Sequence, residues 1–277
     1  MHIKPPPVTL PEYIHHLKQD ESLTLSGGGT CEVWELAVPN DATCLSEWAH
    51  RFRQTYCHDK DIDILRAGTG KSRAEYLLEL VFPDKTTPPG PGVRSGDFAE
   101  LLVSDYVEFT LNYWVPRGKY AEKGSRNESV KGVDIVGFKC PDAGKPKPTD
   151  EMLTFEAKAQ LGGGTYKSRL QDAVDDSGKD YFRAGETLAA MKRRMHVAGE
   201  HSSMMVVQRF QDPVGRPYRL LSGAAAILSD AAFDTDGINE TTITGHNNAS
   251  NLKLIAIKGA DLMALAHALY QRAADEA

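Results

Sequence analysis

The sequence lacks several features that would assign a protein class at once. Its longest uninterrupted apolar stretches, such as residues 224–228, fall far short of the roughly 18–20 residues needed to cross a membrane. The first seven residues contain three prolines and no apolar core of a signal peptide, so we expect a cytoplasmic protein without membrane contact. The four cysteines, Cys31, Cys44, Cys57 and Cys140, form no CxxC pair, which argues against a zinc site or a disulfide framework.

A large excess of one charge is also missing. The 277 residues include 38 acidic and 32 basic side chains, for a formal net charge of −6. This balance argues against a protein that coats nucleic acid by charge alone, but not against one that holds nucleic acid locally through loops and metal ions. Hydrophobic residues at 41% and charged residues at 25% are the proportions of a globular protein, which excludes a disordered chain.

The clearest interruption along the chain is rich in proline and glycine. It divides the sequence into an N-terminal α/β region (residues 1–82), for which partner docking is suggested only by elimination, a linker (83–94) and a C-terminal domain (95–277). Hydrophobic periodicity predicts an α/β fold with a mixed sheet flanked by helices. The expected strands are residues 32–38, 62–66, 113–116, 132–138, 153–161, 204–210, 218–221 and 252–257. The expected helices are residues 42–56, 95–112, 168–176, 183–197 and 260–274.

Residues 153–161 carry the most information. Their odd positions are all apolar, whereas the even positions are Thr154, Glu156, Lys158 and Gln160. Because alternate side chains of a strand point to opposite faces, one face is built for a core and the other presents a carboxylate, an ammonium and an amide in a row. A half-solvated sheet with a same-face charge pair would give the same short pattern, so a second observation is needed to indicate chemistry.

Asp134 supplies that second observation. It stands within an otherwise apolar strand, where an isolated carboxylate is costly to bury unless it is paired or binds a metal. An antiparallel hairpin would bring Asp134 beside Glu156, and a divalent cation such as Mg²⁺ or Mn²⁺ would relieve their repulsion. With Lys158 to orient or deprotonate an attacking water, or to counter phosphate charge, the three residues predict metal-assisted phosphodiester hydrolysis.

The order of these segments resembles the PD-(D/E)XK nuclease core. The runs GDFAELL (96–102), KGVDIVGF (131–138) and FEAK (155–158) more specifically resemble HamA, the nuclease subunit of the Hachiman antiphage defence system, and its AbpA-like relatives. The resemblance spans residues 94–161 and departs from the fold's motif in one place, where Val133 replaces the proline before Asp134. It implies a PD-(D/E)XK-like nuclease domain at 95–277, a DNA substrate and a HamB-like helicase partner.

The resemblance also implies residue roles. Asp134, Glu156 and Glu100 would bind Mg²⁺, with Mn²⁺ as a substitute; Lys158 would be the catalytic lysine and Gln160 would extend the site. Structural alternatives stay open at this point. An acid such as Glu100 in the first turns of a helix is favoured by the helix dipole without any function, and Lys158 could simply pair with Glu156.

Two further segments invite a functional interpretation. A loop between the expected strands 113–116 and 132–138 could contact phosphates and stack on a base, or be a solvated basic loop; its residues are Arg117, Lys119, Tyr120, Lys123, Arg126 and Lys131. Residues 68–72 (GTGKS) imitate a phosphate-binding loop, but Leu65 stands where the full pattern requires glycine, so we expect no bound NTP.

The sequence therefore predicts a cytoplasmic, Mg²⁺-dependent deoxyribonuclease, the effector of a bacterial antiphage complex. One alternative keeps the enzyme class and makes the protein a stand-alone repair or restriction endonuclease. Another makes it a non-catalytic DNA-binding subunit of a helicase complex. Plasmid cutting by the isolated protein, without any partner, would support the first alternative. Unchanged DNA binding and partner activity in a Glu156→Ala protein would support the second.

Overall fold

The computed structural model describes residues 10–142 and 144–277, so the predictions for residues 1–9 lie outside the described residues. Its centre is a six-stranded sheet in the order β1-β2-β6-β5-β4-β3. The strands are β1 (Leu17–Thr24), β2 (Thr30–Leu36), β3 (Ile135–Lys139), β4 (Glu151–Gln160), β5 (Arg219–Ser229) and β6 (Leu252–Gly259). The four inner strands are parallel and the two edge strands are antiparallel to their neighbours, which confirms a mixed sheet in an α/β fold.

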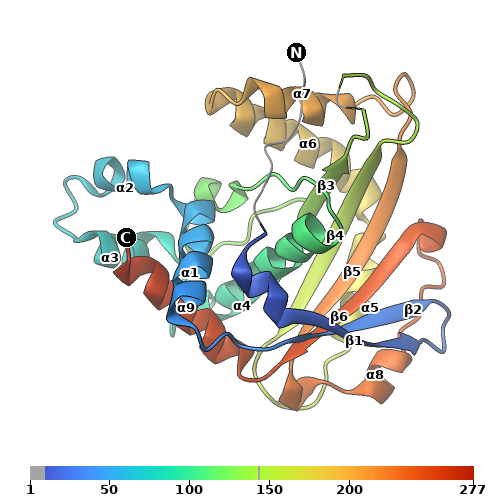
Figure 1. Ribbon diagram of the computed structural model, residues 1–277, viewed down its shortest axis with the longest axis horizontal. Helices are drawn as coiled ribbons and strands as arrows, with labels where there is room; N and C mark the ends of the chain where they lie inside the picture. The colour runs from blue at the N-terminus through green and yellow to red at the C-terminus, as the bar shows by residue number, and fades with distance from the viewer. Residues whose placement is uncertain (1–9, 143) are drawn as a thin grey trace.

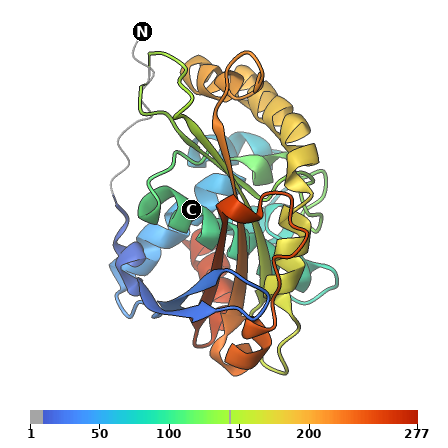
Figure 2. The same cartoon turned by 90° about the vertical axis from the view of Figure 1, so that its right-hand side faces the viewer.

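Helices cover both faces of this sheet (Figures 1 and 2). On one face lie α1 (Ala42–Tyr56), α4 (Gly90–Asp105) and α9 (Leu262–Asp275). On the other lie α5 (Arg169–Ser177), α6 (Asp180–Val197), α7 (His201–Arg209) and α8 (Thr235–Asn239). Shorter elements are η1 (Glu12–His16), α2 (Asp59–Arg66), α3 (Arg73–Tyr76), η2 (Leu77–Val81), η3 (Tyr106–Thr110), η4 (Lys119–Glu122), η5 (Asp230–Ala232) and η6 (Ala249–Asn251). No helix in residues 10–142 and 144–277 combines the length and apolar character that crossing a bilayer requires.

The alternation predicted for β4 sets the two core layers. Leu153, Phe155 and Ala157 pack into the core under α1, α4 and α9, as their odd positions predicted. The even positions face α5 and α6, and Glu156 on this face is only 2% exposed. This face is therefore covered by helices, and the interpretation of a half-solvated sheet does not hold for it.

Strand β5 has a glycine, Gly223, where it pairs with the aromatic residue Phe155 of β4. A Cβ atom built on Gly223 would lie 2.2 Å from two atoms of the Phe155 ring. Phe155 is fully buried, so its ring has nowhere to move. The absence of a side chain at residue 223 leaves the space that the Phe155 ring occupies beside β5.

Two expected strands are helices. Residues 62–66 belong to α2, which begins with acids at Asp59 and Asp61 and ends with Arg66, the charge order that the helix dipole favours. Residues 204–210 belong largely to α7, whose apolar side chains pack against α6 instead of entering the sheet. Both are short apolar runs for which periodicity does not separate strand from helix.

Two other predictions need correction. The expected strand 113–116 is reduced to a single bridge between Trp114 and Phe138. The expected linker 83–94 is wrong from Gly90 onward, because α4 begins there with Pro91 in its first turn, where proline's missing N–H costs no hydrogen bond.

The N-terminal region is part of the same sheet as the rest of the chain. Strand β2 pairs in parallel with β6, with Val33 opposite Ala256, and α1 packs along α9. Residues on both sides of 83–94 thus share one sheet and one core. That segment marks no boundary between sheets, and the partner-docking role of residues 1–82 stays a prediction.

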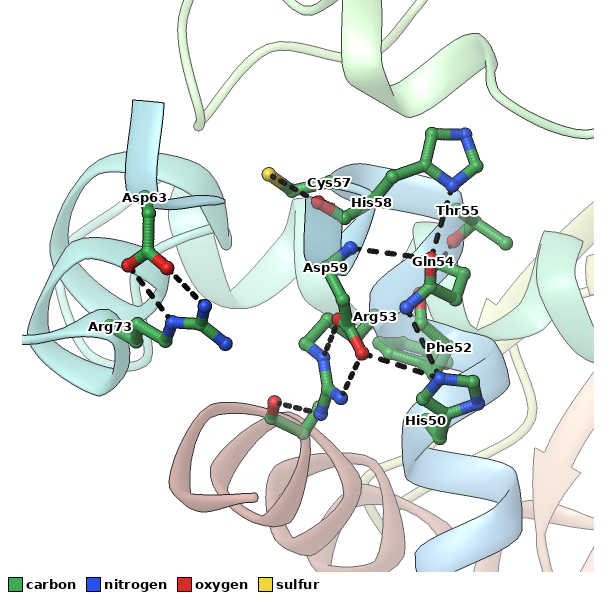
Figure 3. Close-up of polar contacts among 11 residues, drawn as sticks. His50, Phe52, Arg53, Gln54, Thr55, Cys57, His58, Asp59, Asp63 and Arg73 are labelled. Atoms are coloured by element: carbon green, nitrogen blue, oxygen red, sulfur yellow. Dashed lines mark hydrogen bonds and ion pairs between the residues drawn. The ribbon is translucent and has the colours of Figure 1, made fainter. Parts of the chain in front are cut away.

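A buried arginine joins three helices in this region (Figure 3). Arg53 of α1 donates two hydrogen bonds to Asp59 at the start of α2, at 2.6 and 2.9 Å, and a third to the Ala273 carbonyl of α9 at 2.8 Å. The Arg53 side chain is 4% exposed, and each of its three guanidinium nitrogens has an acceptor within the protein. The contact fixes the angle at which the chain leaves α1.

Candidate functional site

The β3–β4 hairpin brings together the two carboxylates that the sequence singled out. The strands are antiparallel with Ile135 opposite Phe155, which places Asp134, just before β3, across from Glu156. Asp134 Oδ2 also accepts a hydrogen bond from the Ala157 amide at 3.1 Å, which fixes its carboxylate at the edge of β4. The predicted pairing of Asp134 with Glu156 is confirmed.

A third carboxylate, Asp180 at the start of α6, lies against Glu156. Asp180 is 1% exposed and neither of its carboxylate oxygens has a hydrogen-bond donor; Glu156 Oε1 also lacks one. The nearest cation to that Glu156 oxygen is Arg183, whose Nη1 is 3.7 Å away, beyond hydrogen-bonding distance. Buried acceptors that face each other without donors require a proton or a cation between them.

The electrostatics of the three acids reflect this shortage. Burial, and then the charge of Asp180, raises the pKa of Glu156 to about 7. Burial also raises the pKa of Asp134 to about 7, although the nearby Lys119 charge opposes the rise. Burial raises the pKa of Asp180 to about 7 as well. Fully ionised, the cluster would concentrate negative charge in a poorly solvated place, which is the condition that a divalent cation relieves.

Lys158 lies on the same face of β4 as Glu156, as predicted. Its Nζ is 2.5 Å from Asp176 of α5 and 3.7 Å from Glu156 Oε2. Burial disfavours its charge, but the hydrogen bond to Asp176 and the charge of Glu156 more than offset this, and the pKa of Lys158 is raised. The side chain therefore carries a fixed positive charge beside the carboxylates and is poorly suited to accept a proton.

Glu100 is linked to the site at one remove. Its carboxylate forms an ion pair with Lys119 and accepts a hydrogen bond from the Tyr120 hydroxyl at 2.6 Å. Lys119 in turn donates to the main-chain carbonyl of Asp134 at 2.8 Å. Burial raises the pKa of Glu100, the charge of Lys119 opposes the rise and the charge of Asp134 adds to it, so the two carboxylates lie near each other. Glu100 supports Lys119 and Asp134 in this geometry, and its role as a metal ligand stays a prediction.

Gln160 has a structural position. Its Nε2 donates to the Thr165 carbonyl at 2.9 Å and its Oε1 accepts from the Lys167 amide at 3.0 Å. Both polar ends of the amide hold the loop between β4 and α5. Its predicted extension of the site is therefore indirect, through the shape of that loop.

Most side chains of the predicted nucleic-acid loop point inward. Tyr120 is buried and bonded to Glu100, and Lys131 is exposed. The other cations pair with acids of α4, of η3 after it or of the segment before it: Arg117 with Asp105 and Glu108, Lys119 with Glu100, Lys123 with Asp97, and Arg126 with Asp84. Cations already neutralised within the fold are poorly placed to neutralise phosphates, so the geometry favours a structural role for all of this loop except Lys131.

Residues 68–72, which resemble a phosphate-binding loop in sequence, form the connection between α2 and α3. The segment follows helix α2, not a strand, and Ser72 caps α3 through a reciprocal pair of hydrogen bonds with Glu75. Lys71 forms an ion pair with Glu79.

Three charged residues near Glu156 and Lys158 were not predicted from the sequence: Asp176, Asp180 and Arg183. A signal for Asp180 was present: it begins the stripe completed by Ala184, Leu188, Met191 and Met195, which α6 buries. An acid in line with an apolar stripe is a candidate for a buried functional carboxylate. Placing the start of this helix at residue 183 hid that alignment.

Comparison with known protein families decides which family the chain belongs to. The sequence matches the HamA family model over residues 11–273. This chain belongs to the HamA family. Membership makes it a protein related to Hachiman antiviral defence, and the match extends well beyond the quarter of the chain that carries the resembling motifs. No curated protein and no solved structure matches the chain.

Proposed function

We propose that this HamA-family protein is a metal-dependent nuclease that hydrolyses DNA phosphodiester bonds. The observation that carries the proposal is the pairing of Asp134 with Glu156 beside Lys158 on one face of β4. The order of these residues along a β hairpin, with flanking helices on both faces, is also what the PD-(D/E)XK core would require. We include that fold assignment in the proposal.

The residues present fit a divalent cation. The donors are carboxylate oxygens, which Mg²⁺ and Mn²⁺ prefer, and the Glu156 oxygen without a donor is one of them. Among the described residues, no three or more His, Cys, Asp or Glu side chains are arranged to hold a metal ion together. Asp134 and Glu156 would therefore supply two ligands, with water completing the shell, as Mg²⁺ commonly allows. When bound, the cation would supply Lewis-acid stabilisation of charge on the phosphate.

The other residues have roles that follow from their charges. Lys158 keeps a positive charge beside the carboxylates and would stabilise negative charge that develops on the phosphate oxygens. Arg183 has a side chain 38% exposed and would bind a neighbouring phosphate. Lys119, held by Glu100, would keep the Asp134 backbone in register.

A partner is part of the proposal. A nuclease of broad sequence tolerance would damage the DNA of its own cell, so control by a HamB-like helicase is physically reasonable. We propose that the protein acts as the effector of such an antiphage complex.

The test is cleavage of supercoiled and linear DNA by the purified chain in Mg²⁺, Mn²⁺ or EDTA. We expect metal-dependent cutting that Asp134→Asn and Lys158→Met each reduce on the order of 100-fold or more, because each removes charge that the transition state needs. Lys60→Ala, which alters an exposed lysine of α2, is the matched control and should cut normally.

Calorimetric titration with Mg²⁺ distinguishes a metal site whose activity depends on a partner from the absence of a metal site. If the isolated chain does not cut but binds Mg²⁺ through Asp134 and Glu156, partner control is supported. Folded wild-type protein that neither cuts DNA nor binds Mg²⁺ or Mn²⁺ would contradict the nuclease proposal.

A further inference from the structure

Two neighbouring aromatic side chains stand out on the surface of the molecule. Tyr181 is 68% exposed and Phe182 is 76% exposed, and their rings meet edge to face with centroids 5.4 Å apart. In the part of the chain that the structure describes, the other tyrosine, phenylalanine and tryptophan side chains are buried or half-buried. Leaving two large apolar rings together in water has a free-energy cost that a folded protein usually avoids unless the rings bind something.

The position of the pair connects it with the carboxylate site. Tyr181 and Phe182 lie in the first turn of α6, between Asp180 and Arg183. Asp180 is buried against Glu156, and Arg183 Nη1 lies 3.7 Å from Glu156 Oε1. Since residues three apart in a helix share a face, the residues on either side of the aromatic pair point into the site while the pair itself points out from its rim.

Cations surround the same rim. Lys179, whose side chain is 58% exposed, and Lys158 both pair with the same acid, Asp176, so positive charge is left over there. Arg183 is 38% exposed and lies 3.7 Å from Glu156, too far for a hydrogen bond. These cations are thus less completely neutralised than those of the loop 117–131. Positive side chains beside exposed aromatic rings are the groups that bind single-stranded nucleic acid, with the cations at its phosphates and the rings stacked on its bases.

We propose that Tyr181 and Phe182 form a stacking platform for unpaired bases, so that the preferred substrate is single-stranded DNA. The proposal rests on the nuclease function proposed above and names its substrate class. In a duplex the bases are already stacked on one another, so Tyr181 or Phe182 could stack on a base only after that base had been unstacked, which costs free energy. An unpaired strand offers its base faces without that cost, while its phosphates reach Lys179 and Arg183.

Binding of the full-length chain to labelled oligonucleotides tests the platform without requiring cleavage. We would measure fluorescence anisotropy of a thymidine 20-mer and of a hairpin duplex, in EDTA and again with Ca²⁺. Tyr181→Ser combined with Phe182→Ser should weaken single-strand binding at least about tenfold and duplex binding by less than about twofold. The ring-preserving exchange Tyr181→Phe with Phe182→Tyr should restore binding.

Val197→Ser and Val214→Ser remove exposed apolar side chains elsewhere and should leave binding unchanged. The proposal is overturned if the wild type does not prefer the single strand, or if the double serine variant binds it as the wild type does. The second result would instead favour a protein partner on these rings. Normal single-strand binding by a chain that neither cuts DNA nor binds Mg²⁺ or Mn²⁺ would overturn the nuclease proposal and leave the platform standing.

Discussion

At the scale of single residues, the pH dependence of stability is set by three buried or partly buried carboxyl groups: Asp134, Glu156 and Asp180. Each has a raised pKa, with burial as the leading cause. A carboxyl whose pKa is higher in the folded than in the unfolded chain binds more protons when folded between the two values. The free energy of unfolding should therefore fall as the pH rises from about 4, the ordinary value, to about 7.

Replacing Asp180 by asparagine should remove part of this dependence. The variant loses a carboxylate that has no donor but keeps its size, so in EDTA at pH 8 we expect it to be more stable than the wild type by about 1 kcal/mol or more. At pH 4 the difference should vanish. Urea unfolding at both pH values measures it.

Glu186→Gln is the matched control, because Glu186 is an exposed acid on the same helix. It should leave both stabilities within about 0.5 kcal/mol of the wild type. A variant at residue 180 that is less stable than the wild type at pH 8 in EDTA would mean that Arg183, 3.8 Å from Asp180 Oδ1, stabilises the carboxylate by more than its burial costs.

At the scale of elements, the exit of α1 depends on one arginine (Figure 3). Arg53→Met would leave the Ala273 carbonyl without its donor and Asp59 without its bidentate partner. Because Asp59 is 38% exposed, water recovers part of the loss, and we expect about 2 kcal/mol of destabilisation in urea unfolding. Arg66→Met, at a more exposed ion pair of α2, should cost much less, because water screens that pair. Equal losses in the two variants would contradict the view that burial of Arg53 matters.

The elements that the sequence predicted well have a clear one-sided pattern. Helices α1, α5 and α9 and strands β4 and β6 lie within a few residues of their predicted positions. The edge strand β1 was not predicted, because its inner residues from Lys18 to Ser22 are exposed and charged or polar, as suits an edge. Most of β5 was also missed, since its run of alanines is poor in strand propensity and forms a strand only between two helical layers.

The candidate site was predictable to the same degree. Strand alternation and a lone acid were enough for Asp134, Glu156 and Lys158, because hairpin geometry is local. The contact of Asp180 with Glu156 depends on how α6 crosses the sheet, which no local pattern specifies. The inward pairing of the loop cations depends on the acids of α4, which lie far away in sequence.

At the scale of the whole molecule, the sheet should not survive division at the proline-rich segment. A chain of residues 83–277 would lose β2 and expose the apolar β6, whose Leu254, Ile255, Ala256 and Ile257 are at most 2% exposed. We expect this fragment to aggregate or to lack a cooperative thermal transition by circular dichroism, whereas residues 10–277 should unfold cooperatively. A folded, monomeric fragment would restore the interpretation of separate domains.

The close approach of Phe155 to Gly223 bears on how relatives of this protein would be interpreted. No side chain fits at residue 223 while the ring stays in place, so an alignment of relatives that keep this ring would show glycine there as invariantly as it shows the acids. Invariance at these two kinds of position has different origins, steric exclusion in one and chemistry in the other. Ranking residues by invariance alone would thus assign a catalytic role to a position that only makes room.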